Sequence, residues 1–89
     1  MATVTTSVCD SFHGSPGDTV NFTNPTSTVT YTITPAPNST WPFTATNPES
    51  ISVPPAGGTA TIANVPNATY YYDVSPDCPN LTRKTLTIP

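Results

Sequence analysis

Charged side chains are scarce in this 89-residue chain, where Asp, Glu, Lys and Arg together make up 8% of the residues. The only basic residues are Arg83 and Lys84, and the formal net charge is -3. Nucleic acids and anionic membranes attract proteins through clusters of Lys and Arg. The sequence therefore predicts no nucleic-acid partner. Solubility must come from uncharged Thr, Ser and Asn, a composition that favours an extracellular or periplasmic location.

Long apolar runs are also missing. None approaches the length that a membrane-spanning helix needs, so we expect no membrane insertion. The N-terminus lacks a basic segment followed by an apolar one, and we expect that the signal peptide of a secreted precursor has been removed. No window repeats its apolar residues every 3.6 positions, and the twelve prolines leave little room for a helix.

The side chains needed for acid–base catalysis are few. The chain has one histidine, His13, with one glutamate and one lysine. Asp10 and Asp18 lie near His13 in sequence, but a nucleophilic triad also needs a buried orienting group and an oxyanion hole. The neighbouring Pro and Gly residues indicate that His13 lies in an edge strand or a turn. We therefore expect no enzymatic activity and no cofactor.

The two cysteines, Cys9 and Cys78, are too few for a structural zinc site, which needs four ligands. They can form one disulfide, which would close most of the chain into a loop and contribute roughly 4 kcal/mol to stability. Such a bond implies an oxidising compartment. The alternative is a pair of free, buried thiols.

Apolar residues alternate with polar ones in seven short segments, as expected for strands with one buried face. Turn signals rich in Pro, Gly and Asn separate these segments. They predict an all-β Greek-key sandwich of seven to eight strands, in a single domain over residues 1–89. The alternating apolar positions are Val4 and Val8; Val20 and Phe22; Val29, Tyr31 and Ile33; Ile51 and Val53; Ala60 and Ile62; Tyr70, Tyr72 and Val74; and Leu86 and Ile88.

Four stretches of the sequence carry a family resemblance. Two of them are Ile51 to Ile62, which is similar to F/L-x-x-G-x-x-x-x-x-F, and Asn67 to Tyr70, which is similar to P-G-T-Y. The segment from Phe12 to Phe22 is similar to F-x-V-x-x-G-E/D-x-V-x-F, and Asn24 follows it at the family's Asn position. The segment from Thr69 to Cys78 is similar to T-Y-x-F/Y-x-C-x-P-H, which precedes a last strand of alternating apolar residues. Together these motifs resemble the cupredoxins, small blue copper proteins of the plastocyanin and azurin type.

The resemblance implies a cupredoxin-like fold without its metal. The family's four ligands fall on Thr30, Val74, Asp77 and Thr82. Blue copper needs a thiolate and two imidazoles, so the resemblance predicts no metal. It also places Cys9 and Cys78 at the same end of the fold. Their disulfide would hold that end together, as copper does in the family. The main alternative is an immunoglobulin-like domain, which prefers an inter-sheet cysteine pair beside a buried Trp.

The remaining candidates for function are aromatic and hydroxyl side chains. Exposed Trp41, Phe43 and Tyr71 would suit a partner-binding surface, although Trp41 could instead cover the core. Threonines also alternate in rows that suit ice or carbohydrate binding, or simply a solvent-facing strand. These rows are Thr28, Thr30, Thr32 and Thr34; Thr85 and Thr87; and Thr3 and Thr5.

We therefore expect a secreted or periplasmic, non-enzymatic structural or binding module, with an unidentified protein or glycan as its partner. The first alternative is a metal-binding or electron-transfer protein with a degenerate site. The second is a carbohydrate- or ice-binding surface that uses the threonine rows.

Overall fold

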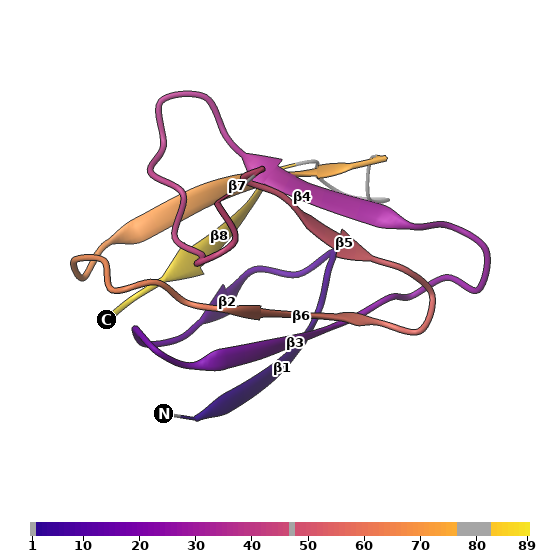
Figure 1. The fold of residues 1–89 in the computed structure, drawn as a ribbon, viewed down its shortest axis with the longest axis horizontal. Helices are drawn as coiled ribbons and strands as arrows, with labels where there is room; N and C mark the ends of the chain where they lie inside the picture. Colours follow the sequence, from indigo (N-terminus) through magenta and orange to yellow (C-terminus); the bar gives the residue numbers. More distant parts are fainter. Residues whose placement is uncertain (1, 47, 77–82) are drawn as a thin grey trace.

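The computed structural model describes residues 2–46, 48–76 and 83–89, which form eight β-strands and no helix. No described helix therefore has the length and apolar character needed to cross a membrane. The strands form two mixed sheets, one of three strands and one of five (Figure 1). They are β1 (Thr3–Ser7), β2 (Phe12–His13), β3 (Thr19–Thr23), β4 (Tyr31–Pro35), β5 (Ile51–Val53), β6 (Gly58–Thr61), β7 (Thr69–Ser75) and β8 (Arg83–Thr87).

The three-stranded sheet has the order β1-β3-β6. β1 runs parallel to β3, with Val4 opposite Val20, and β3 runs antiparallel to β6, with Val20 opposite Ala60. Because side chains alternate along a strand, this register gathers Val4, Val20 and Ala60 on the inner face. The same register places the Thr-rich positions together on the outer face.

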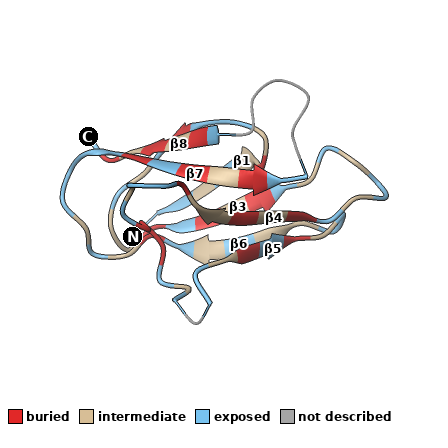
Figure 2. Cartoon of the chain, turned by 90° about the horizontal axis from the view of Figure 1, so that it is seen from above, coloured by how far each residue is buried: buried red, intermediate tan, exposed pale blue. Residues whose placement is uncertain are grey.

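The five-stranded sheet has the order β2-β8-β7-β4-β5. Its β7 is the longest strand and lies between β4 and β8, antiparallel to both. The two-residue strand β2 joins parallel to β8, with Phe12 opposite Leu86. Tyr70, Tyr72 and Val74 of β7 are buried, whereas Tyr71 between them is 45% exposed. The predicted alternation in this segment is therefore confirmed (Figure 2).

Buried side chains from both sheets form one hydrophobic core. All the alternating apolar positions predicted from the sequence are buried, except Val4, Val29 and Ala60, which are half-buried against the same core. Four rings link the sheets: Phe22 of β3 lies edge-on to Phe12 at 5.7 Å and to Phe43 at 6.1 Å, and Phe43 lies 6.0 Å from Tyr72 of β7. Aromatic pairs in this geometry add to the stabilisation from burial.

Trp41 and Phe43 are core residues, which corrects their prediction as exposed partner-binding aromatics. Trp41 is 7% exposed and Phe43 1%, and their rings lie 5.1 Å apart. Trp41 donates its indole N–H to the carbonyl of Ala45, while Phe43 forms a β-bridge with Ile62 next to β6. The alternative that Trp41 covers the core is therefore right.

The predicted threonine row on residues 28–34 is also wrong in part. β4 begins at Tyr31, so Thr28 and Thr30 lie in the connection before the strand. Asn24 shapes this connection by donating to the carbonyls of Val29 and Val53, at 2.7 and 2.9 Å, and by accepting from the amide of Thr26 at 2.8 Å. Only Thr32 and Thr34 of the row alternate within β4.

Candidate functional site

The outer face of the three-stranded sheet is built almost entirely from hydroxyl side chains and carries no charged residue. We call it the hydroxyl face. Six of its eight residues are exposed, and Ser7 and Asn21 are half-buried. The hydroxyl face consists of Thr3, Thr5, Ser7, Thr19, Asn21, Thr23, Thr59 and Thr61.

The strand register arranges these side chains in rows across the sheet. Thr3, Thr19 and Thr61 lie opposite one another and form one row. Thr5, Asn21 and Thr59 form the next, and Ser7 lies opposite Thr23. Neighbouring strands are about 4.8 Å apart, and alternate residues along a strand are about 6.7 Å apart. The face therefore presents hydroxyl groups at regular intervals in two directions.

Most polar groups on the hydroxyl face are available to a ligand. Among the described residues, only two of its side chains hydrogen-bond within the protein: Thr23 donates to the carbonyl of Thr6 at 3.4 Å, and the Ser7 hydroxyl accepts from the amide of Cys9 at 3.2 Å. A threonine hydroxyl can donate once and accept twice, and an asparagine amide can do both. The remaining side chains can therefore bond to water or to a hydroxylated ligand.

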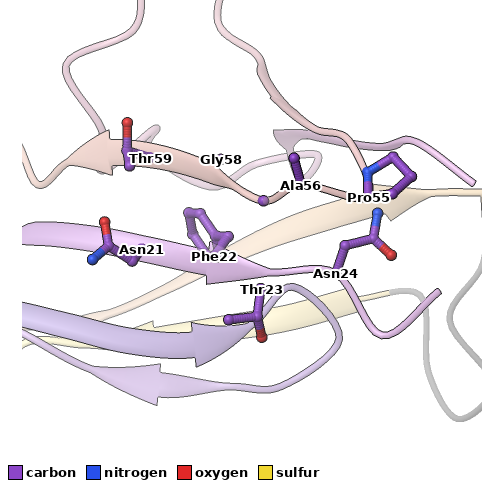
Figure 3. A pocket seen from close by; sticks show the side chains of 9 residues that line it. Asn21, Phe22, Thr23, Asn24, Pro55, Ala56, Gly58 and Thr59 are labelled. Carbon is purple, nitrogen blue, oxygen red and sulfur yellow. The ribbon is translucent and has the colours of Figure 1, made fainter. Parts of the chain in front are cut away.

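A groove of about 520 Å³ lies at one end of the hydroxyl face. The side chains of Asn21, Thr23 and Thr59 line it from the face, and the turn at Pro55 and Ala56 lines its other side (Figure 3). These groups are uncharged. The groove therefore offers amide and hydroxyl partners next to a small apolar wall.

The turn beside the groove depends on two glycines. Gly57 has a φ of 96°, a conformation that side chains other than glycine rarely adopt. A Cβ atom on Gly58 would lie 2.6 Å from the backbone oxygen of Ser52 in β5. Because backbone atoms cannot move aside as a flexible side chain can, Gly58 lets β6 approach β5 and fixes the position of the groove wall.

Asp18 anchors the start of β3 at the opposite end from the groove. It is buried, and its carboxylate accepts hydrogen bonds from the amides of Ala2 at 2.9 Å and Ser15 at 3.0 Å. The bond from Ala2 and then the bond from Ser15 favour the ionised carboxylate and lower the pKa of Asp18. Asp18 thus ties β1 and the Gly14–Gly17 turn to β3, so its charge has a structural role.

The outer face of the five-stranded sheet has a different character. Arg83 of β8 donates to Asp73 of β7 at 3.0 Å, and this bond raises the pKa of Arg83. Tyr71 is exposed on the same face, opposite Thr85. His13, predicted to lie in an edge strand or a turn, is exposed in edge strand β2. This face therefore carries charge and an aromatic ring, which the hydroxyl face does not.

The positions that match copper ligands in the cupredoxin pattern do not come together as a described site. Val74 is buried in β7, where its aliphatic side chain packs in the core, and Thr30 is exposed before β4. Asp77 and Thr82 lie outside the described residues. The structure describes no group of three His, Cys, Asp or Glu residues that could hold a metal ion.

Of the two cysteines in the predicted disulfide, the structure describes only Cys9. Cys9 is half-buried and packs against the core just after β1. Cys78 lies outside the described residues. The Cys9–Cys78 bond therefore stays a prediction.

Comparisons with protein-family models, with curated proteins and with solved structures found no match. The candidate site therefore depends on the geometry alone. Part of it was visible in the sequence, since Thr19, Asn21 and Thr23 alternate with Val20 and Phe22. What the sequence could not supply was the pairing that sets β3 between β1 and β6.

Proposed function

We propose that this protein is a secreted or periplasmic, non-enzymatic recognition module that binds a neutral, hydroxylated polymer such as a polysaccharide through the hydroxyl face. The observation that carries the proposal is the regular array of uncharged hydroxyl and amide groups beside the groove. Sugars present hydroxyl groups that can donate to and accept from Thr and Asn. A surface without charge offers no opposite charge to attract an ionic ligand.

The fold behind this proposal is a cupredoxin-like sandwich that lacks the copper ligands. The strand pairing supports it over the immunoglobulin-like alternative. Both sheets contain a parallel pair, β1 with β3 and β2 with β8, whereas immunoglobulin sheets are antiparallel. Val74 at the position of the thiolate ligand argues against the degenerate metal site.

Binding to an insoluble neutral polysaccharide, such as cellulose or chitin, tests the function. Thr59→Val removes one hydroxyl at the groove while keeping the shape and strand preference of the side chain. We expect it to weaken binding about two- to tenfold, which corresponds to one hydrogen bond. The matched control is Thr85→Val on the outer face of the five-stranded sheet, which should leave binding unchanged.

Salt provides a second criterion. Because the hydroxyl face holds no charged residue, the affinity should change little between low and high ionic strength. A steep loss of binding in salt, or equal losses for Thr59→Val and Thr85→Val, would show that the hydroxyl face is not the site. Failure to bind any neutral polysaccharide would overturn the proposed function.

Two specific observations favour other candidates. Tyr71 is 45% exposed on the five-stranded sheet, and large exposed aromatics often anchor protein partners. If Tyr71 is the anchor, Tyr71→Ala will abolish binding that Thr59→Val leaves intact. The regular rows of the hydroxyl face also suit an ice surface, and inhibition of ice growth by the wild type but not by Thr59→Val would favour that ligand over a glycan.

A further inference from the structure

The four sheet edges of the protein are protected to different degrees. β6 is flanked by the segment at Phe43, which bridges to Ile62, and the amide of Thr44 donates to the carbonyl of Thr61 at 2.9 Å. β2 is two residues long, and β5 has three residues followed by Pro54 and Pro55. Short strands, prolines and covering segments are the usual means of blocking a sheet edge.

Among the described residues, none of these protections is found at β1. It is five residues long, contains neither Pro nor a charged residue, and lies at the end of the three-stranded sheet (Figure 1). Its sequence, Thr-Val-Thr-Thr-Ser, is rich in β-branched residues that favour strands. An exposed edge of this kind is a template for pairing with another strand.

The hydrogen bonds at the two ends of β1 show which of its backbone groups face outward. The carbonyl of Ala2 accepts from Thr19, and the amide of Val8 donates to Thr23, both at 2.9 Å. In a parallel pair, every second residue directs both its N–H and its C=O to the neighbouring strand. The even-numbered residues therefore face β3, and the backbone groups of Thr3, Thr5 and Ser7 point away from it. Of these, the Ser7 carbonyl already accepts from the amide of Asp10 at 3.1 Å, so the amides of all three residues and the carbonyls of Thr3 and Thr5 are left for another strand.

We infer that β1 pairs antiparallel with β1 of a second copy, with Thr5 of one copy opposite Thr5 of the other. The two Thr5 residues would exchange a pair of backbone hydrogen bonds, and the carbonyl of each Thr3 would accept from the amide of Ser7 of the second copy. The interface thus gains about four backbone hydrogen bonds. The amide and carbonyl of Thr5, the carbonyl of Thr3 and the amide of Ser7 all find partners in this register.

A second copy fits this edge because β1 is self-complementary. In the antiparallel register, hydroxyl residues meet hydroxyl residues on the outer face, and half-buried Val4 meets half-buried Thr6 on the inner face. No charge on β1 opposes its copy, so the like-charge repulsion that often keeps edges apart is missing. An isologous contact of this kind closes as a twofold dimer and does not extend into a fibre.

Dimerisation would join two three-stranded sheets into one sheet of six strands. The hydroxyl faces of the two copies would become one continuous surface. The dimer does not depend on what that surface binds, so it can hold even if the proposed polysaccharide binding fails. Since the contact is a single strand pair, we expect a weak dimer, with Kd between about 1 μM and 1 mM.

Charge substitution at Thr5 tests both the dimer and its register. Thr5→Lys and Thr5→Glu each place two like charges opposite one another, so each variant alone should associate at least about tenfold more weakly than the wild type. An equimolar mixture of the two variants pairs Lys with Glu and should restore the dimer. Sedimentation equilibrium over a range of concentrations measures all three samples.

The matched control is Thr59→Lys, which adds the same charge to the same face but on the opposite edge strand, and it should dimerise like the wild type. A wild type that stays monomeric throughout, or a mixture that fails to recover, would overturn the proposal. So would equal weakening by Thr59→Lys, or a dimer that reductant dissolves. Unchanged thermal unfolding of the Thr5 variants at low concentration shows that they remain folded.

Discussion

The two sheets resemble each other on the inside and differ on the outside. Phe22 of the three-stranded sheet and Tyr72 of the five-stranded sheet are both fully buried in the same aromatic cluster. On the outer faces, one sheet presents only uncharged Thr, Ser and Asn, and the other presents exposed Tyr71 and the Arg83–Asp73 ion pair. Packing thus constrains the inner faces alike, and the difference between the outer faces indicates where recognition can occur.

The two sheets also differ in the surroundings of their carboxylates. Asp18 beside the three-stranded sheet is buried and held by two backbone amides. Asp73 on the five-stranded sheet pairs with Arg83, whose side chain is 53% exposed. A surface ion pair of this kind contributes little, because water and salt screen it. Of the two carboxylates, the one that matters more for the fold is therefore Asp18, at the start of β3.

Removing a ring from the shared core should have the largest effect. Phe22→Ala takes away a fully buried side chain that contacts Phe12 and Phe43. We expect a loss of about 3 to 5 kcal/mol in the free energy of unfolding, from lost burial and the cavity left behind. Urea unfolding measures it.

The control is Tyr71→Ala on the outer face of the five-stranded sheet, which should change stability by no more than about 0.5 kcal/mol. If the two substitutions cost the same, the distinction between inner and outer faces does not hold. A loss below about 1 kcal/mol for Phe22→Ala would place that ring at the surface.

Adding a side chain where β6 approaches β5 should have the next largest effect on stability. The new methyl group of Gly58→Ala meets the backbone oxygen of Ser52, so the strands must shift at a cost of about 1 to 3 kcal/mol. Ala56→Ser in the adjacent exposed turn is the control and should be nearly neutral. Thermal unfolding compares the two, and a Gly58→Ala protein as stable as wild type would mean that the strands are not in contact there.

The sequence predicted the strands well because alternation is a local property. Tyr70, Tyr71 and Tyr72 were assigned to opposite faces from spacing alone, and the structure agrees. The exposure of Phe43 was predicted wrongly, and Trp41 was left between surface and core, because both lie in a segment rich in Pro, Ser and Asn, without alternation. Their segment is held against the core by the bridge from Phe43 to Ile62, a residue distant in sequence that lies next to β6.

The candidate site was harder to predict for a related reason. The threonines of β1, β3 and β6 each alternate, but only strand pairing places Thr3, Thr19 and Thr61 in one row. Sequence spacing suggested a longer row that included Thr28 and Thr30, which the connection held by Asn24 excludes. Local periodicity predicts which side chains of one strand share a face. The pairing of strands that are distant in sequence determines which of these faces combine into one surface.

The dependence of stability on pH should distinguish Asp18 from Asp73, with an effect that is smaller but measurable. The pKa of Asp18 is lowered in the folded protein by the amides of Ala2 and Ser15. The ionised carboxylate therefore stabilises the fold at pH values above its unfolded pKa of about 3.9, and this stabilisation is lost as the pH falls through the lower folded value. Asp18→Asn should lower stability at neutral pH and flatten the acid side of the profile.

Asp73→Asn is the matched control for this experiment. It removes the partner of Arg83 on the five-stranded sheet, and we expect a smaller change at neutral pH that high salt erases. Thermal unfolding between about pH 2 and pH 7 follows both variants. An Asp18→Asn profile with the same slope as wild type in acid would show that Asp18 is not the group that couples the fold to pH.

Copper should have the smallest effect, because the ligand positions of the cupredoxin pattern hold the wrong side chains. Thr30, buried Val74, Asp77 and Thr82 supply neither the thiolate nor the imidazoles that blue copper requires. Wild-type protein titrated with Cu(II) should show no intense visible absorption. The informative comparison is the triple variant Thr30→His, Val74→Cys and Asp77→His, which restores the ligand types at those positions. Blue absorption in the variant alone would support the cupredoxin resemblance, whereas blue absorption in the wild type would contradict the assignment of the ligand positions.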